Sequence, residues 1–171
     1  MPGSRENRAM RITFKFDYQI SRTMAFEKEY HPNLRFTLKE KQSLLRRALV
    51  IWMFVDEKLA GETYGIPVAE MGPDERPEGT PPDPEAIYCY SNTILGKFKD
   101  KGFGTILKAA FLGRASAQFR RVYGHARPGA SQALNKKFGA RMLATHKNWY
   151  GTGEDYRLYV LEISRDKRKK T

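Results

Sequence analysis

The stretch ILGKFKDKGFGTIL, residues 94–107, joins two apolar runs through a basic turn that carries two glycines one residue apart. Before it, AIYCYSNTIL (residues 86–95) is rich in β-branched and aromatic residues, which predicts a buried strand. After it, apolar residues recur at the spacing of one helix face, which predicts a helix over residues 102–119; they are Phe103, Ile106, Leu107, Ala110 and Phe111. The turn therefore lies between a strand and the start of a helix.

Such a turn is suited to bind a phosphate group. A helix N-terminus leaves backbone N–H groups unpaired and carries a partial positive charge, and glycine lets an anion approach the main chain. Lys97, Lys99 and Lys101 add positive charge around the turn. The sequence lacks the Gly-Lys-Ser/Thr of a P-loop and the third glycine of a dinucleotide fingerprint. The alternative interpretation is structural: the glycines only give the start of the helix room to pack against a strand.

The remaining elements follow from periodicity. Residues 10–20 alternate as a strand does, and residues 22–48 have helical spacing with a break near residues 31–33 and a capping box at Thr37–Glu40. Further strands are predicted at residues 48–55, 59–68, 121–126, 141–149 and 155–163, and a helix at residues 129–138. The runs 48–55 and 59–68 predict a hairpin around Asp56-Glu57-Lys58. In the helix 129–138, Ala133, Leu134 and Phe138 are expected to face inward, and Gly139 to end the helix. The strand–helix–strand order around residues 86–126 predicts a parallel pair within a mixed sheet, with helices on both faces.

Composition is that of a folded protein with an uneven charge. Hydrophobic residues make up 40% of the 171 residues, and we expect one domain over residues 10–164, an extension at 1–9 and a basic tail at 165–171. No apolar run is long enough to span a membrane or to serve as a signal peptide, and the single cysteine, Cys89, favours the cytoplasm.

The net charge is +12, and residues 97–147 hold twelve Lys and Arg against one acid, which favours an anionic ligand or partner. Residues 71–86 hold five acids and one Arg. The acidic segment 71–85 predicts a surface loop. This loop either covers a binding cleft as a lid or only links two strands.

Two motifs resemble those of the GCN5-related N-acetyltransferase (GNAT) superfamily. ILGKFKDKGFGTIL resembles motif A, with Ile94, Gly96, Lys99, Gly102 and Gly104 at the motif positions. ASQALNKKFGARM, residues 130–142, resembles motif B through Leu134, Lys137 and Gly139. The resemblance covers roughly residues 10–164. It implies the acyl-CoA N-acyltransferase fold, an α+β fold with a mixed, mostly antiparallel sheet of about six to seven strands.

The resemblance implies acetyl-CoA or another acyl-CoA as co-substrate, no metal, and direct transfer of the acyl group to an amine. The residues implied to contact the co-substrate are Ile94, Leu95, Gly96, Lys99, Lys101, Gly102, Phe103, Gly104, Thr105, Asn135 and Phe138. Lys99 replaces the usual Arg or Gln, and Asn135 replaces a tyrosine that often protonates the leaving thiolate; an amide is a poor acid.

The general base stays open. Period two on the strand 86–95 puts Tyr88, Tyr90 and Asn92 on the face of Ile94, and Cys89 on the other face as a core residue. Candidates for acid–base catalysis are Tyr88, Tyr90, His125 and Glu62, with Asn135 beside the sulfur; a structural role competes at each.

Several functions stay open beside the acyltransferase. The basic region 97–147 and the tail favour an acceptor linked to nucleic acid or the ribosome, including modification of DNA, with Tyr123, Trp149 and Tyr150 as candidate stacking residues. The alternatives are a nucleic-acid-binding module without catalysis and a CoA-binding sensor. A homodimer is compatible with the sequence, and no membrane association is expected.

Overall fold

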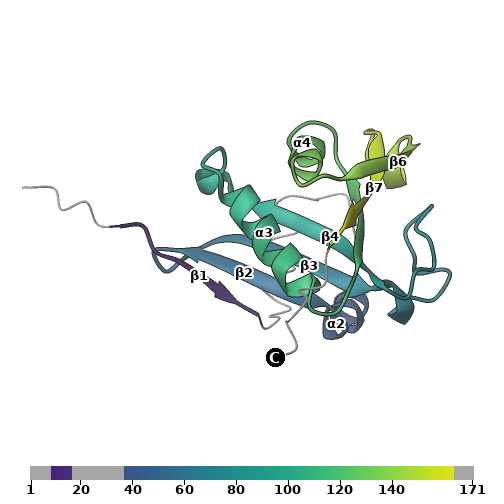
Figure 1. The fold of residues 1–171 in the computed structure, drawn as a ribbon, viewed down its shortest axis with the longest axis horizontal. Helices are drawn as coiled ribbons and strands as arrows, with labels where there is room; N and C mark the ends of the chain where they lie inside the picture. The colour runs from purple at the N-terminus through teal and green to yellow at the C-terminus, as the bar shows by residue number, and fades with distance from the viewer. Residues whose placement is uncertain (1–8, 17–36, 164–171) are drawn as a thin grey trace, which may run out of the picture.

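The computed structural model describes residues 9–16 and 37–163 (Figure 1). Its strands are β1 (Ile12–Lys15), β2 (Leu49–Val55), β3 (Lys58–Pro67), β4 (Ala86–Ile94), β5 (Arg121–Ala126), β6 (Arg141–His146) and β7 (Tyr156–Glu162). Its α-helices are α2 (Leu38–Arg46), α3 (Phe103–Ala115) and α4 (Ala130–Lys137). The strands form a seven-stranded sheet in the order β1-β2-β3-β4-β5-β7-β6. Among the strands of the described residues, β4 and β5 alone pair in parallel, which confirms the predicted mixed, mostly antiparallel sheet.

Local sequence signals account for the first elements. Thr37 caps α2: its hydroxyl accepts a hydrogen bond from the Glu40 N–H at 3.2 Å, and the Glu40 carboxylate accepts from the Thr37 N–H at 2.7 Å. Asp56 and Glu57 both have positive φ, at 46° and 67°, which is the two-residue turn that matches the twist of a hairpin. Lys58 already belongs to β3, so the predicted hairpin is confirmed with a turn one residue shorter.

The helices cover both faces of the sheet, as predicted. The core on one face packs α3 residues Phe103, Leu107 and Phe111 against strand residues such as Ile51 and Ile87. The other face buries Leu45 of α2 with Val50, Trp52 and Tyr64, next to a cluster around Tyr88 and Tyr123. Figure 1 shows α3 crossing the sheet in front of β2, β3 and β4.

Some sequence predictions are wrong in detail. The helix predicted over residues 102–119 ends at Ala115, and within it Ile106 is 37% exposed whereas Lys108 is 1% exposed. In α4, Ala133 is exposed and Asn135 is buried. Both errors arise because spacing alone does not say which side of a helix meets the sheet.

Element ends also shift. The predicted strand 141–149 stops at His146, and Trp149 begins a short 3₁₀ turn, Trp149–Gly151. Residues 17–36 lie outside the described residues, and they include most of the helical region predicted at 22–48.

Candidate active site

The central strands β4 and β5 separate part-way along their length. They pair only at Ala86↔Arg121, Ile87↔Val122 and Tyr88↔Tyr123. Beyond this point β4 continues to Ile94 with β3 as its partner, and β5 continues to Ala126 with β7 as its partner. The diverging halves leave a gap between the strands, here called the fork. Beyond Tyr88, no strand of the described residues pairs with the β4 edge that faces β5, so the N–H and C=O groups of this edge can pair with an extended ligand.

A β-bulge lies at the start of the fork. Tyr64 of β3 pairs with Ser91 and the next residue, Gly65, pairs with Cys89, so Tyr90 is an extra residue on β4. The bulge reverses the alternation of side chains along β4. Ile94 therefore packs on the α3 face with Cys89, whereas Tyr88 and Tyr90 pack on the opposite face. The prediction that Tyr88, Tyr90 and Ile94 share a face is wrong for this reason, and Cys89 is a core residue as expected.

The basic glycine turn lies at the far end of β4. After Ile94 and Leu95, a 3₁₀ turn (Gly96–Phe98) leads to α3, whose N-cap is Gly102. Gly102 has φ 83° and ψ 0°, a left-handed conformation that favours glycine, and a Cβ built there would meet nothing within 4 Å. No side-chain hydrogen bond caps the helix, which leaves the N–H groups of its first turn for another acceptor.

The lysines of the turn are placed around this helix start. Lys97, Lys99 and Lys101 are exposed. The Lys101 ammonium donates a hydrogen bond to the Lys97 carbonyl at 3.2 Å, which folds the turn back on itself. Gly104 is less open than Gly102: a Cβ there would lie 3.8 Å from Ile94 and 3.9 Å from Leu134. Gly104 thus lies where α3, the end of β4 and α4 meet.

Asn135 of α4 and Phe138, which ends α4, follow Leu134, the α4 residue near Gly104. Asn135 is 4% exposed, and its Nδ2 donates to the Ser131 carbonyl at 2.9 Å. Its Oδ1 is buried and has no hydrogen-bond partner among the described atoms. Phe138 packs against the core on the α3 side. A buried oxygen without a donor is costly, which suggests a group that a bound ligand would satisfy.

Tyr88 and His125 meet across the fork on the face opposite α3. The Tyr88 hydroxyl and His125 Nδ1 are hydrogen-bonded at 2.7 Å. Burial, with a contribution from His146, lowers the pKa of His125 to about 3, so its imidazole is neutral at pH 7. Burial raises the pKa of Tyr88 well above its usual value, and burial raises that of Tyr90 to about 12. Two of the predicted catalytic residues are therefore in contact, both in neutral form.

Aromatic rings continue outward from this pair. Trp149 stacks on His125 with ring centroids 3.8 Å apart, and His146 lies edge-on to His125 at 4.9 Å. Tyr150 packs edge-on against Trp149 and is 67% exposed, with a φ of 45° that is rare for an aromatic residue. Glu62, by contrast, is fully buried on β3, where it pairs with Trp52 of β2 and Thr93 of β4.

The acidic loop 71–85 is tied to the fold by ion pairs. Glu75 binds Arg47 at 3.1 Å, Asp83 binds Arg121, and Glu78 lies 3.6 Å from His146. The hydrogen bond from Arg121 lowers the pKa of Asp83. The loop acids therefore serve as partners for basic residues of α2 and β5, and the loop reaches the rings beside the fork.

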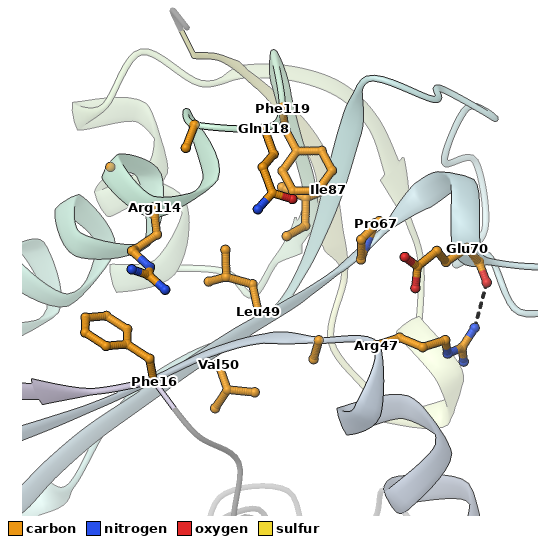
Figure 2. A pocket seen from close by; sticks show the side chains of 13 residues that line it. Phe16, Arg47, Leu49, Val50, Pro67, Glu70, Ile87, Arg114, Gln118 and Phe119 are labelled. Carbon is orange, nitrogen blue, oxygen red and sulfur yellow. Dashed lines mark hydrogen bonds between the residues drawn. The ribbon is translucent and has the colours of Figure 1, made fainter. Parts of the chain in front are cut away.

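A separate cavity of about 520 Å³ lies at the other end of α3 (Figure 2). Figure 2 shows Leu49, Ile87 and Arg114 among its lining residues, and the hydrogen bond from Arg47 to the Glu70 carbonyl at its rim, at 2.7 Å. Because Arg114 belongs to the last turn of α3, this cavity is more than a dozen ångströms along the helix from Gly102. It is distinct from the fork.

Comparison with solved structures finds the same fold in several acetyltransferases. The ribosomal-protein-S18-alanine N-acetyltransferase of Escherichia coli is 15% identical, with a TM-score of 0.66 over 90% of this chain and 95% of that chain. Arabidopsis thaliana NAA60 in complex with acetyl-CoA is 17% identical, with a TM-score of 0.66 over 90% of this chain and 100% of that chain.

The chain has the GNAT fold. A GNAT-fold aminoglycoside 6'-N-acetyltransferase complexed with coenzyme A, 8% identical, matches with a TM-score of 0.66 over 88% of this chain and 97% of that chain. In sequence, the chain matches no protein-family model and no curated protein. The fold predicted from the two motifs is confirmed by these structures, although they are only 8% to 17% identical to the chain.

None of the helices within residues 9–16 and 37–163 is long and apolar enough to cross a membrane. Within the same ranges, no three His, Cys, Asp or Glu side chains are grouped as metal ligands would be.

Sequence reasoning missed Lys108, Tyr159 and the stacking of Trp149 on His125. Their partners are distant in the chain, and lysine in an amphipathic helix is normally exposed.

Proposed function

We propose that the protein is an acyl-CoA-dependent N-acyltransferase, with acetyl-CoA as the expected donor, that transfers the acyl group directly to an amine in a ternary complex. The observation that carries the proposal is the fork between β4 and β5, open next to a glycine-capped helix start. An extended donor with a diphosphate needs both features together: a strand edge to pair with and a set of free N–H groups for its anionic end.

In this proposal the residues of the turn hold the donor. The N–H groups of Gly102, Phe103, Gly104 and Thr105 bind the diphosphate, and Lys99 and Lys101 supply charge around it. The edge of β4 at Ile94, Leu95 and Gly96 pairs with the amide-containing arm of the donor, and a β4 N–H within the fork polarises the thioester carbonyl. Asn135 and Phe138 border the sulfur. The thioester itself has no S–H, but the thiol of the product CoA can donate to the buried Asn135 Oδ1, which has no other partner among the described atoms.

Tyr88 and His125 are the proposed proton acceptors. As the amine attacks the thioester carbon, its nitrogen becomes positive and strongly acidic. Tyr88 takes the amine proton while its own hydroxyl proton passes to Nδ1 of the neutral His125, 2.7 Å away. Because burial lowers the pKa of His125 to about 3, the imidazolium holds this proton only until water takes it. The tetrahedral carbon then re-forms its carbonyl and expels CoA as a thiolate, which takes a proton from water because the Asn135 amide cannot supply one. Tyr90, which packs edge-on against Tyr88 with ring centroids 4.8 Å apart, orients the phenol. Glu62 is not assigned this role, because it is wholly buried on β3.

The acceptor is proposed to enter from the face opposite α3, where the exposed Tyr150 ring lies beside the Tyr88–His125 pair. An acceptor on nucleic acid or at the ribosome agrees with the net charge of +12 and with rings that can stack on bases. A cytoplasmic location agrees with the single cysteine, which is buried in the core. A homodimer remains a prediction.

One observation favours a second candidate, a protein that binds CoA or nucleic acid without catalysis. By its place in the motif, Asn135 would lie beside the sulfur, and an amide cannot protonate a thiolate. In this candidate the glycine turn still binds a phosphate group. Salt-dependent binding of DNA or RNA without any affinity for acetyl-CoA would select it.

Calorimetry with acetyl-CoA, followed by release of free thiol across a panel of amines, tests the proposal. The panel includes a peptide N-terminus, a lysine peptide, a polyamine and an oligonucleotide with exocyclic amines. Binding with thiol release for at least one amine is expected. Binding without release from any amine favours the sensor, and absence of binding overturns the proposal.

A further inference from the structure

The core beneath the fork contains a lysine that the proposed chemistry does not use. Lys108 of α3 is 1% exposed. Its Nζ donates a hydrogen bond to the Tyr159 hydroxyl at 3.0 Å and lies 3.9 Å from Cys89 Sγ. Among the residues that the structure describes, no carboxylate forms an ion pair with this amine. Burial lowers the pKa of Lys108, which is consistent with a neutral amine.

The contacts of Lys108 coincide with the point where the strands separate. Tyr88↔Tyr123 is the last β4–β5 pair, so Cys89 and Gly124 are the first residues of the two diverging halves. Lys108 contacts Cys89 directly. It reaches Gly124 through Tyr159, whose ring lies so close beneath β5 that a Cβ on Gly124 would be 2.5 Å from the phenol oxygen. One amine therefore connects both sides of the fork on its α3 face.

We propose that Lys108 is a positioning residue of the donor site, and that its bridge between Cys89 and Tyr159 holds the fork at the width that the donor needs. The inference rests on the proposed function, because the fork is the proposed donor site. A buried amine without a carboxylate is costly compared with an apolar side chain of the same length. Such a cost is retained where a site must be held in one geometry before the ligand arrives.

A double replacement separates positioning from stability. Lys108→Met alone leaves the buried Tyr159 hydroxyl without its amine partner, and Tyr159→Phe alone leaves the amine without its oxygen, so both single variants should unfold at lower temperature. Lys108→Met/Tyr159→Phe removes both polar groups and keeps the packing, so it should unfold at or above the wild-type temperature. The bridge is nevertheless absent, and the affinity for acetyl-CoA should fall about tenfold because the fork must be ordered on binding.

The experiment measures the acetyl-CoA dissociation constant and the unfolding temperature for the full chain and these variants. Leu107→Met is the matched control, because it changes the adjacent buried residue of α3 and leaves the amine in place. Where turnover is detected, the double variant should raise KM for the acyl donor and leave KM for the amine unchanged.

Two results overturn the inference. The first is wild-type affinity in the double variant, which would make the bridge a purely structural contact. The second is an equal loss of affinity in Leu107→Met, which would attribute the effect to core packing. If the wild-type protein binds no acyl-CoA, the proposed function fails first, and the inference fails with it.

Discussion

Tyr88 on β4 and His125 on β5 are hydrogen-bonded at 2.7 Å although their strands stop pairing at Tyr88. The contact spans the opening of the fork on the face away from α3. Trp149 stacks on the other side of the His125 imidazole, which holds the ring in place. These two neutral groups lie in contact beside the proposed donor site, and in the proposed mechanism they accept one proton and pass it on.

Removal of the phenol should impair turnover more than binding. We expect Tyr88→Phe to lower kcat by about 10²- to 10⁴-fold, the usual contribution of a positioned acid–base group. The dissociation constant for acetyl-CoA should stay within about twofold of the wild-type value, because the proposed donor site consists of main-chain groups at the start of α3 and at the end of β4. Tyr156→Phe is the control, since its ring also belongs to the aromatic group and lies 6.0 Å from Trp149. Equal turnover in Tyr88→Phe and the wild-type protein would remove Tyr88 from the mechanism.

His125 should make stability depend on pH. Its pKa is lowered to about 3 in the folded protein, against about 6.5 when unfolded. Between these values the unfolded chain binds the extra proton, so the free energy of unfolding falls as pH decreases, by up to about 1.4 kcal/mol per pH unit from this group.

Denaturant unfolding at several pH values between 4 and 7 measures this effect. His125→Phe lacks the hydrogen bond to Tyr88 at every pH, so it should be less stable than wild type. It also lacks the group that titrates, so its free energy of unfolding should fall less as pH decreases. The difference in free energy of unfolding between wild type and His125→Phe should therefore shrink as pH falls. A constant difference across the range would contradict a buried neutral imidazole.

Gly104 offers a direct test of the donor site. A tryptophan there would extend between the end of β4 and α4, because even a Cβ comes within 3.9 Å of Ile94 and Leu134. We expect Gly104→Trp to abolish acetyl-CoA binding in calorimetry. Gly104→Ala places only a methyl group at ordinary contact distance and is the matched control, with affinity close to wild type. Unchanged affinity in Gly104→Trp would mean that the donor does not bind at the start of α3.

Two glycine replacements should have opposite effects on stability. Gly124→Ala would put a methyl group 2.5 Å from the Tyr159 hydroxyl oxygen, and we expect a loss of about 1–3 kcal/mol from overpacking. Gly113 lies inside α3, where a Cβ would meet nothing within 4 Å. Gly113→Ala should therefore add about 0.5–1 kcal/mol through helix propensity. Chemical denaturation measures both, and a stable Gly124→Ala protein would show that Tyr159 can leave its place beneath β5.

Much of the fold could be read from local sequence. The two-residue turn at Asp56 and Glu57, the capping box at Thr37 and the glycine before α3 each depend on residues close in the chain, and all three are present in the structure. The same holds for the order of strands and helices, since periodicity is a local property. The candidate donor turn was therefore predictable.

The acid–base pair was predictable only as separate candidates. Tyr88 and His125 lie 37 residues apart, and their contact depends on how far β4 and β5 run side by side. The face of Ile94 was assigned wrongly because the extra residue of the bulge, Tyr90, reverses the alternation of the residues that follow it. Register and bulges result from pairing between distant segments, which no window of sequence contains.

By itself the sequence determined the element order and the basic glycine turn before α3, because backbone preference and periodicity act over a few neighbouring residues. Only the tertiary structure decided where β4 and β5 separate, that Tyr88 meets His125, and that Lys108 is buried with Cys89 and Tyr159. A charged side chain is buried or exposed according to what packs over it, and what packs over Lys108 comes from strands far away in the chain.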